Sequence, residues 1–243
     1  MITDSEDLHS DTTGATSQKL ISFLWRHLWL VISLFIMTLG VAVCVRSNFG
    51  SSVISAIPYA FTLAGRTGSA PSLTIGEYTN IMNIILVGGQ ILILRKRFQR
   101  IQLFQLVIGF LFGFLLDVNM LLTAGLDCQS LYSKIICQII GCIILGIGIA
   151  LEIKCGSVTM PGEGFPAAIS KATGASFPSI KIIVDILLVV GAILSGYLFF
   201  ERWLWEVVGP GTLFAMLFVG LVVKFVSYRI LWFDRLLTIN ITR

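Results

Sequence analysis

The sequence predicts an all-α polytopic membrane protein with six transmembrane helices, two short re-entrant half-helices and an inverted internal repeat. Three observations lead to this prediction. The chain is 56% hydrophobic and only 12% charged, whereas soluble domains carry about 25% charged residues. Apolar stretches of about 20 residues, each long enough to cross a bilayer core of about 30 Å, recur along it. The third observation is that the chain repeats itself.

Three segments of the first half return in the same order in the second half. The pairs are 39–51 (LGVAVCVRSNFGS) with 145–157 (LGIGIALEIKCGS), 83–92 (NIILVGGQIL) with 185–194 (DILLVVGAIL), and 113–117 (GFLLD) with 220–224 (GLVVK). In an apolar chain, such a duplication is typical of transporters and channels, whose binding site lies where the two halves meet. We therefore expect two membrane repeats, 21–125 and 126–230. They are flanked by a disordered cytoplasmic tail (1–20) and a cytoplasmic interfacial tail (231–243).

Two apolar pieces are too short to be ordinary spans. At 1.5 Å per residue, segments 52–64 and 165–173 are about 20 Å and about 14 Å long. Both follow the first long helix of their repeat, and short interrupted segments at matching positions are the best sequence indicator of a transporter's site. The spans themselves are expected at 27–46, 74–94, 102–124, 132–153, 179–200 and 206–228.

The distribution of the 17 Lys and Arg residues favours six spans over eight. If both short pieces are re-entrant, 13 of these residues face the cytoplasm and four face outside; if both pieces cross, the division is 10 to 7. Short cytoplasmic loops are enriched in Lys and Arg, so the six-span topology, with both termini cytoplasmic, is preferred. Three crossings per repeat invert the second half relative to the first. A tilted arrangement in which the short helices do cross stays open as the alternative.

The composition gives little support to metal, redox or nucleic-acid chemistry. The two His residues stand in the N-terminal tail and at a helix start, and the five Cys residues show no paired metal-ligand spacing. The net charge of +4 comes from residues that lie mostly at helix ends. We expect no cofactor, no metal site and no nucleic-acid partner, and, because no nucleophile–base pair is visible, no enzymatic activity.

The first group of candidate binding residues lies around the two short pieces. Ser51 or Ser52 is expected to cap the first of them, and the exposed amides after Asn48 suit an anion, although a capped turn with no ligand fits as well. The segment 156–166 is rich in Gly and Pro, which predicts irregular backbone there. Its carbonyl groups, with Thr159 and Glu163, would suit a cation or an amine, so the loops leave the charge of the solute open.

The second group consists of polar residues inside spans, which are functional candidates by default. Asp185 has Asn83 as its counterpart in the repeat, Asn80 shares a face with Asn83, and Asp117 is matched by Lys224. A structural ion pair or a helix-to-helix hydrogen bond is the alternative for each acid. We predict that segments 47–52 and 156–163 meet near the midplane around one polar cavity, flanked by Asn83 and Asp185.

Short motifs add a resemblance to a known family. They are Arg46-x-x-x-Gly50-Ser51-Ser52, Leu73-Thr-Ile-Gly76 at the start of a span, and Gly211-Thr212 with Gly220 in the last span. Over most of residues 35–225 the chain resembles the YczE/YitT-like bacterial integral membrane proteins. The resemblance implies a multispan protein of the bacterial inner membrane. The acidic residue that such proteins often show soon after the first re-entrant Pro is not evident here.

The sequence therefore favours a secondary transporter or channel for a small polar solute or ion. The alternative is a membrane-embedded accessory protein that binds a partner and transports nothing. A dry, fully packed midplane would favour that accessory role. The bilayer and the solute are the expected partners. The identity and charge of the solute, the coupling ion and the oligomeric state, including a homo-oligomer, stay open.

Overall fold

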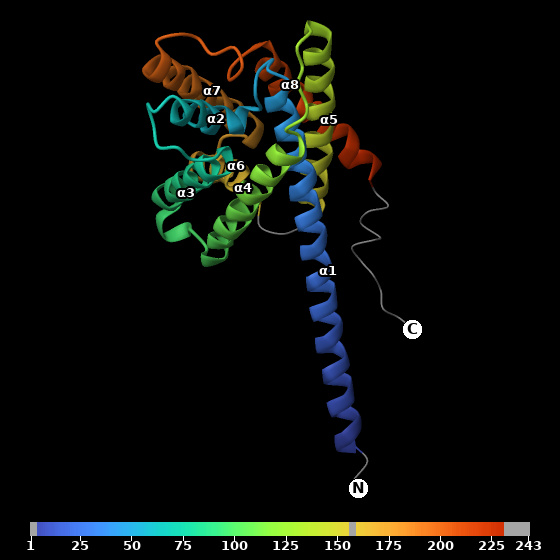
Figure 1. The fold of residues 1–243 in the computed structure, drawn as a ribbon. Helices are drawn as coiled ribbons and strands as arrows, with labels where there is room; N and C mark the ends of the chain where they lie inside the picture. Colours follow the sequence, from blue (N-terminus) through green and yellow to red (C-terminus); the bar gives the residue numbers. More distant parts are fainter. Residues whose placement is uncertain (1–3, 156–158, 231–243) are drawn as a thin grey trace.

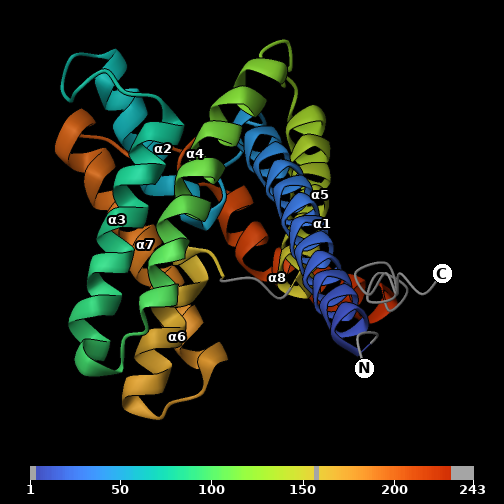
Figure 2. The same ribbon diagram turned by 90° about the horizontal axis from the view of Figure 1, so that it is seen from below.

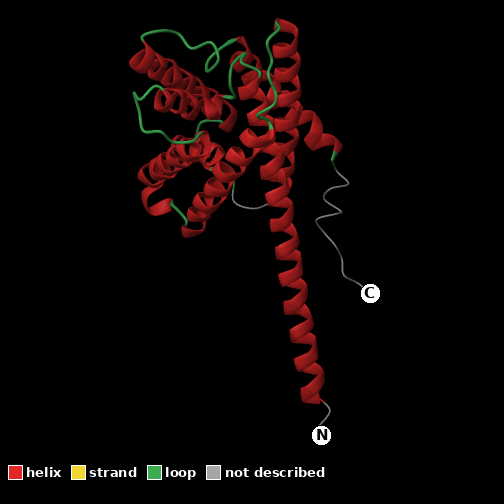
Figure 3. Ribbon diagram, in the orientation of Figure 1, coloured by secondary structure: helices red, strands yellow, loops and turns green. Residues whose placement is uncertain are grey.

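The computed structural model describes residues 4–155 and 159–230, with side chains from residue 24 onward. This part of the chain is helical and contains no strand (Figure 1 and Figure 3). Six of its helices are long and apolar enough to cross a membrane, which confirms the predicted fold class. The helices are α1 (Asp4–Arg46), α2 (Val53–Arg66), α3 (Ile75–Leu94), α4 (Phe104–Leu122), α5 (Leu131–Cys155), α6 (Pro161–Thr173), α7 (Phe177–Phe200) and α8 (Pro210–Arg229), with the short 3₁₀ turns η1 (Arg95–Arg97) and η2 (Arg100–Leu103) between α3 and α4.

The helices form two groups that α4 joins. In the first group α5 packs against both α1 and α8. In the second group the short helices α2 and α6 each contact both of the long helices α3 and α7. Helix α4 packs on α3 of the second group and on α1 of the first (Figure 2). Each short helix therefore touches a long helix from its own half of the chain and one from the other half, so the two halves are interlocked.

Small residues bring α1 and α5 into backbone contact. A Cβ atom on Gly40 would lie 2.8 Å from the carbonyl oxygen of Gly141 and 2.7 Å from the Cα atom of Leu145. A Cβ atom on Gly148 would lie 2.6 Å from the backbone nitrogen of Met37. Small residues serve this purpose in membranes, where van der Waals packing between helices replaces the hydrophobic effect. The two halves of the chain therefore meet most closely along α1 and α5.

The outward faces of the long helices are apolar. Leu92, Leu121 and Leu198 are 75%, 77% and 76% exposed. Exposed apolar area on this scale would be an interaction surface in water, and in a membrane protein it faces the lipid. Helices α7 and α8 are the least buried of the six candidate spans.

The N-terminal segment 1–20, for which the sequence predicted a disordered tail, belongs to helix α1 from Asp4 onward. Helix α1 begins at Asp4 and runs without interruption into the first span. Once the span has nucleated a helix, each further residue adds a hydrogen bond at little cost, so the helix continues through polar residues. Figure 1 shows this extension projecting away from the rest of the molecule. The C-terminal tail 231–243, predicted to lie on the membrane surface, falls outside the described residues.

Helix α6 starts earlier than the sequence predicted. It begins at Pro161, with Pro in the first turn and Glu163 close behind. Pro suits this position because the first amides of a helix have no intrahelical partner, and an acidic residue there is favourable to the helix dipole. The expectation of irregular backbone was therefore wrong for residues 161–166, and residues 156–158 lie outside the described part. Gly162 and Gly164 are needed for packing, because Gly162 lies against Ile54 and Gly164 lies against Gln105 and Gln90.

Candidate functional site

The two short helices meet at their N-termini. Gly162, in the first turn of α6, lies directly against the Ile54 side chain in the first turn of α2. From this contact the two helices run apart along α3 and α7 to opposite ends of those helices (Figure 2). Near the far end of α2, Phe61 packs on Tyr78 and Phe199 with ring centroids 5.4 Å and 5.0 Å away. The meeting point of the short helices therefore lies between the ends of α3 and α7.

The start of α2 is held by the turn that leads into α8. The backbone N–H of Ser51 donates to the carbonyl oxygen of Val207 over 3.0 Å, and the Ser51 hydroxyl donates to the same oxygen over 2.8 Å. Gly50 adopts a φ of 127°, which L side chains rarely adopt, and a Cβ atom there would lie 2.6 Å from Thr212 Oγ1. Ser51 is fully buried, so its amide, expected to be open to an anion, is already bound by the protein.

Asn48 and Ser52 contribute less to α2 than the sequence suggested. Ser52 occupies the N-cap position but makes no capping hydrogen bond through its side chain. Its hydroxyl instead shares a 2.7 Å hydrogen bond with the Ser55 hydroxyl. Asn48 is exposed, with a φ of 50°. The predicted capping role of the Ser51–Ser52 pair is therefore wrong as to the hydrogen bond, although the helix does start after Ser52.

A buried carboxylate outside the predicted set of site residues holds the start of α6. Glu152, in the last turns of α5, is 4% exposed, and its Oε1 atom accepts the backbone N–H of Met160 over 3.1 Å. Met160 is the N-cap residue of α6. Thr159, one residue earlier, is exposed. Glu152 occupies the position that matches Arg46 in the predicted repeat, and this charge reversal was the available sequence signal.

Glu163 of α6 joins a charged cluster on α7. The Lys181 Nζ atom lies 2.7 Å from Asp185 Oδ1 and 3.5 Å from Glu163 Oε1. The side chains of Glu163, Lys181 and Asp185 are 31%, 27% and 13% exposed. Two carboxylates face one ammonium group, so the cluster has a net charge of −1 when all three are ionised. The structure thus brings the candidate residues Glu163 and Asp185 together through Lys181.

Asp117 belongs to a different place, the start of α3. Its two carboxylate oxygens accept the backbone N–H of Gly76 over 2.9 Å and the hydroxyl of Thr74 over 2.6 Å. Thr74 is the N-cap residue of α3, in a capping box with Glu77. Asp117 therefore ties α4 to the N-terminus of α3, which is the structural role that the sequence left open as an alternative.

Asn80 and Asn83 lie along the contact between α3 and α4. The Asn83 side-chain amide donates to the Gly109 carbonyl oxygen at the long distance of 3.4 Å, and Asn80 packs directly on Gly113. Gly109 and Gly113 make room for these amides, because a Cβ atom at either position would lie against the Asn83 or the Asn80 side chain. Asn83 and Asp185, which the predicted repeat matches, thus lie in different surroundings.

Two buried glutamines complete this seam and reach α6. The Gln90 side-chain N–H donates to Gln105 Oε1 over 2.9 Å, and both residues are almost fully buried. A Cβ atom on Gly164 of α6 would lie 2.7 Å from Gln105 Oε1 and 3.0 Å from Gln90 Nε2. Neither glutamine was among the predicted site residues, and the available sequence signal was the placement of polar residues 80, 83 and 90 on one stripe of α3.

Three amide oxygens on this stripe of α3 have no hydrogen-bond donor among the described residues. They are the Oδ1 atoms of Asn80 and Asn83 and the Oε1 atom of Gln90. Buried polar groups in proteins are nearly always paired, so each such oxygen calls for a water, an ion or a ligand. A row of free carbonyl oxygens suits a cation or a group that donates hydrogen bonds.

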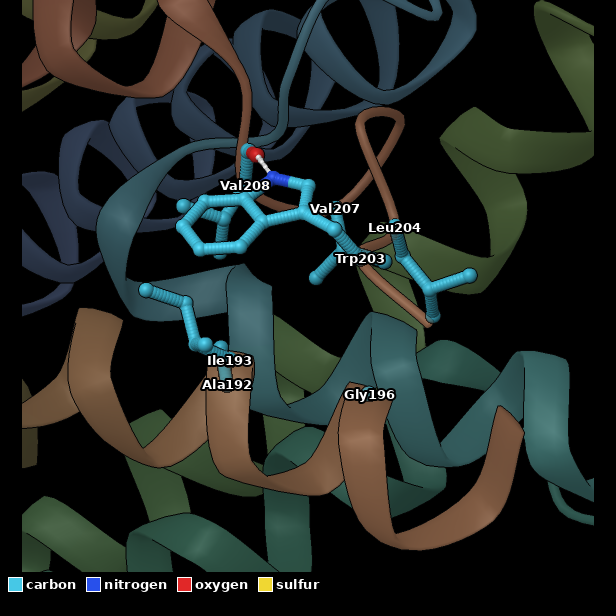
Figure 4. A pocket seen from close by; sticks show the side chains of 7 residues that line it. All are labelled: Ala192, Ile193, Gly196, Trp203, Leu204, Val207 and Val208. Carbon is cyan, nitrogen blue, oxygen red and sulfur yellow. Dashed lines mark hydrogen bonds between the residues drawn. The ribbon is translucent and has the colours of Figure 1, made fainter. Parts of the chain in front are cut away.

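The hollow drawn in Figure 4 is not suited to a polar solute. It lies between α7 and the turn before α8 and is lined by Ala192, Ile193, Gly196, Trp203, Leu204, Val207 and Val208. Its volume of about 10 Å³ is about what a single water molecule requires. The indole N–H of Trp203 already donates to the Val208 carbonyl oxygen over 2.8 Å. The polar groups that could bind a solute lie instead on either side of the first turn of α6.

The contact between the two short helices gives a direct test by substitution. Gly162→Ala should lower the unfolding temperature, because the added methyl group overlaps the Ile54 side chain and overpacking typically costs about 1–3 kcal/mol. Adding Ile54→Ala to the same protein should restore most of the loss, since it removes the overlapping atoms. The measurement is thermal unfolding in detergent of both single variants and the double variant. Additive effects of the two substitutions would contradict the contact.

Comparison with known proteins relates most of the chain to a family. Residues 24–228 match the model of a family described as "Family of unknown function (DUF6198)". The "Uncharacterized protein YyaS" of Bacillus subtilis (strain 168) is 25% identical over 137 residues, which cover 56% of this chain and 64% of that protein. The alignment thus spans less than two thirds of that relative's length. No solved structure matches the chain.

Proposed function

The chain belongs to the family of unknown function DUF6198, and from the geometry of its half-helices we propose that it is a secondary transporter or channel. Its solute is small and polar and either carries a positive charge or donates hydrogen bonds. The proposed site surrounds the first turn of α6, with the Glu163–Lys181–Asp185 cluster on one side and the amide groups of Gln90 and Gln105 on the other. The observation that carries this proposal is that the charged cluster and the buried amide groups both lie where the half-helices α2 and α6 begin.

The chemistry of these groups supports the choice of solute. The cluster has one carboxylate more than it has ammonium groups, and the free groups on α3 are oxygen atoms, which are acceptors. Ionisable residues inside membrane segments are costly and are generally kept for substrates, ions or protons. An anionic solute would meet repulsion from Glu163 and Asp185 and from the acceptor row.

The packing supports an inverted repeat with re-entrant α2 and α6. Helix α2 contacts α7, and its counterpart α6 contacts α3; α1 contacts α4, and in the same way α5 contacts α8. Paired contacts of this kind are expected when a pseudo-twofold axis relates two halves. With 14 and 13 residues, α2 and α6 are only about 20 Å long, shorter than the bilayer core of about 30 Å.

The proposed location is a bacterial inner membrane, with both termini and the connection between α3 and α4 in the cytoplasm. Four basic residues lie in or beside this connection: Arg95, Lys96, Arg97 and Arg100. This location rests on the charge bias of cytoplasmic loops and on the resemblance to YczE/YitT-like proteins. We also propose that the protein has no enzymatic activity.

The orientation has a simple labelling test. Ser69 and Gln99 are exposed, and they lie in the connections at opposite ends of α3. In a protein whose native cysteines are replaced, Ser69→Cys should react with a membrane-impermeant maleimide added to intact cells, and Gln99→Cys only after permeabilisation. Ser69 is preferable to Gly68, because the φ of 79° at Gly68 strains any side chain. Equal labelling of both cysteines in intact cells would exclude the six-span topology.

Ligand-dependent stability tests the proposed function itself. A panel of small amines, guanidinium compounds and monovalent cations should contain a solute that raises the unfolding temperature, since a ligand selective for the native state stabilises it, by about 2.7 kcal/mol at a hundredfold excess over Kd. The gain should disappear in Glu163→Gln and persist in Asp127→Asn, a control on an exposed loop residue. Stabilisation by organic anions alone would contradict the proposed solute class.

The alternative function, an accessory protein that binds a membrane partner, draws on the low burial of α7 and α8. A partner helix could cover these faces in place of lipid. The contact of the half-helices through Ile54 and Gly162 is also closely packed. The charged cluster beside that contact favours transport, because a partner-binding scaffold does not require it. Absence of both solute stabilisation and solute flux in proteoliposomes would favour the accessory role.

A further inference from the structure

A pair of cysteines at one end of the molecule forms a site that neither the fold nor the proposed transport uses. The Sγ atoms of Cys128 and Cys137 lie 2.7 Å apart. Cys128 is buried in the connection between α4 and α5, and Cys137 lies in the second turn of α5. A disulfide bond needs an S–S distance of about 2.05 Å, which a small movement of the two side chains provides.

The compartment decides whether such a pair is oxidised. The α4–α5 connection lies at the opposite end of α4 from the basic residues Arg95, Lys96, Arg97 and Arg100, so under the proposed orientation it faces the outside. Disulfides form and persist outside the cytoplasm. We propose that Cys128 and Cys137 form a structural disulfide on the outer face, which fixes the link between the two halves of the chain.

The bond forms by exchange with an oxidised thiol–disulfide oxidoreductase of the outer compartment. The thiolate of Cys137, the less buried of the two, attacks one sulfur of that disulfide and forms a mixed disulfide. The Cys128 thiolate then attacks the Cys137 sulfur and releases the oxidoreductase as a dithiol. Two S–H bonds of this chain and the S–S bond of the oxidoreductase break. One S–S bond forms in this chain and two S–H bonds form on the oxidoreductase, so the released dithiol carries both protons and both electrons.

The surroundings of Cys128 make the bond a stable one. Burial is the main cause that raises the pKa of the Cys128 thiol to about 11, and the hydrogen bond with Cys137 adds to it. Very little reactive thiolate then exists at neutral pH, so oxidation without an enzyme is slow. A reducing thiol reaches the buried sulfur with equal difficulty. We therefore expect a permanent connection and not a redox switch.

A second sulfur pair serves as an internal control. Cys44 and Cys142 lie 4.0 Å apart, both fully buried between α1 and α5. No oxidoreductase reaches sulfur atoms inside the helix contact, so these two cysteines should stay reduced. Cys155 has no second cysteine sulfur within bonding distance among the described residues.

The test counts free thiols in the full-length protein. Cells are quenched with N-ethylmaleimide, and the protein is denatured in its presence without a reductant. Three of the five cysteines should then carry the label, and all five should carry it after prior reduction. Peptide mass mapping should place the bond between Cys128 and Cys137, and Cys128→Ser should raise the unreduced count to four. Five labelled thiols in the unreduced wild-type protein, or a bond between Cys44 and Cys142, would overturn the proposal.

The disulfide proposal rests on the proposed orientation, and a second experiment tests the two separately. The maleimide labelling of Ser69→Cys and Gln99→Cys reports the orientation independently. If Cys128 and Cys137 are reduced in the wild-type protein while the Ser69→Cys variant labels from outside, the disulfide alone is refuted. If Cys128 and Cys137 are reduced and the Gln99→Cys variant labels from outside, both the disulfide and the proposed orientation are refuted.

Discussion

Gly40→Ala should be among the most destabilising single substitutions in this chain. The added methyl group would meet the backbone of α5, 2.7 Å from the Cα atom of Leu145 and 2.8 Å from the carbonyl oxygen of Gly141. Backbone atoms cannot turn aside as a flexible side chain can, so α1 and α5 must separate. Overpacking typically costs about 1–3 kcal/mol, and we expect a loss at or above about 3 kcal/mol. Thermal unfolding of the purified protein in detergent measures it.

Gly220→Ala is the matched control for this substitution. Gly220 lies inside α8, is exposed, and has no atom within 4 Å of an added Cβ. Ala is favoured over Gly in a helix interior by about 1 kcal/mol, so Gly220→Ala should leave the protein unchanged or slightly more stable. If Gly40→Ala and Gly220→Ala unfold at the same temperature, the close contact of α1 and α5 does not exist.

Asp185→Asn should lower solute flux at least tenfold while the protein stays folded. Asn is nearly isosteric with Asp and already stands at the matching position, Asn83. Lys181 keeps a partner after the substitution, because Glu163 lies 3.5 Å from its Nζ atom. We therefore expect at least a tenfold loss of flux in proteoliposomes, equivalent to about 1.4 kcal/mol, and only a small change in unfolding temperature.

Two comparisons distinguish this role of Asp185 from a structural one. A purely structural ion pair would instead lose about 3–5 kcal/mol of stability when one partner is removed from a buried site. Asp127→Asn makes the same chemical change at an exposed position and should leave both flux and stability unaltered. Full transport by a well-folded Asp185→Asn protein would show that Asp185 takes no part in the pathway.

The long helices could be predicted from the sequence because their determinants are local. Six apolar stretches of sufficient length specify six helices whatever their neighbours are, and the observed spans start and end within a few residues of the predicted ones. The ion pair of Lys181 with Asp185 was also within reach, because residues four apart share a helix face. An unpaired charge inside a membrane is costly, so Asp185 was expected to have a partner nearby.

The site could be predicted only in part, because its contacts join distant segments. Gln105 faces Gly164, and Glu152 faces the start of α6, through folding that no local pattern records. Asp117 was chosen as a pathway residue on account of its depth in the span, yet it binds the first turn of α3. A carboxylate can satisfy either a solute or a free helix N-terminus, and only the three-dimensional arrangement shows which is present.

The packing of Ile54 on Gly162 has a consequence for the electrical potential across the membrane. An energised membrane works as an electrical insulator, and an elementary charge that crosses it loses about 2.3 kcal/mol per 100 mV. If the proposed pathway runs between the two half-helices, the contact of Ile54 with Gly162 closes it to ions and solute. Each transport event then requires α2 and α6 to separate and to close again. Solute therefore crosses one opening at a time, and the closed protein does not leak ions.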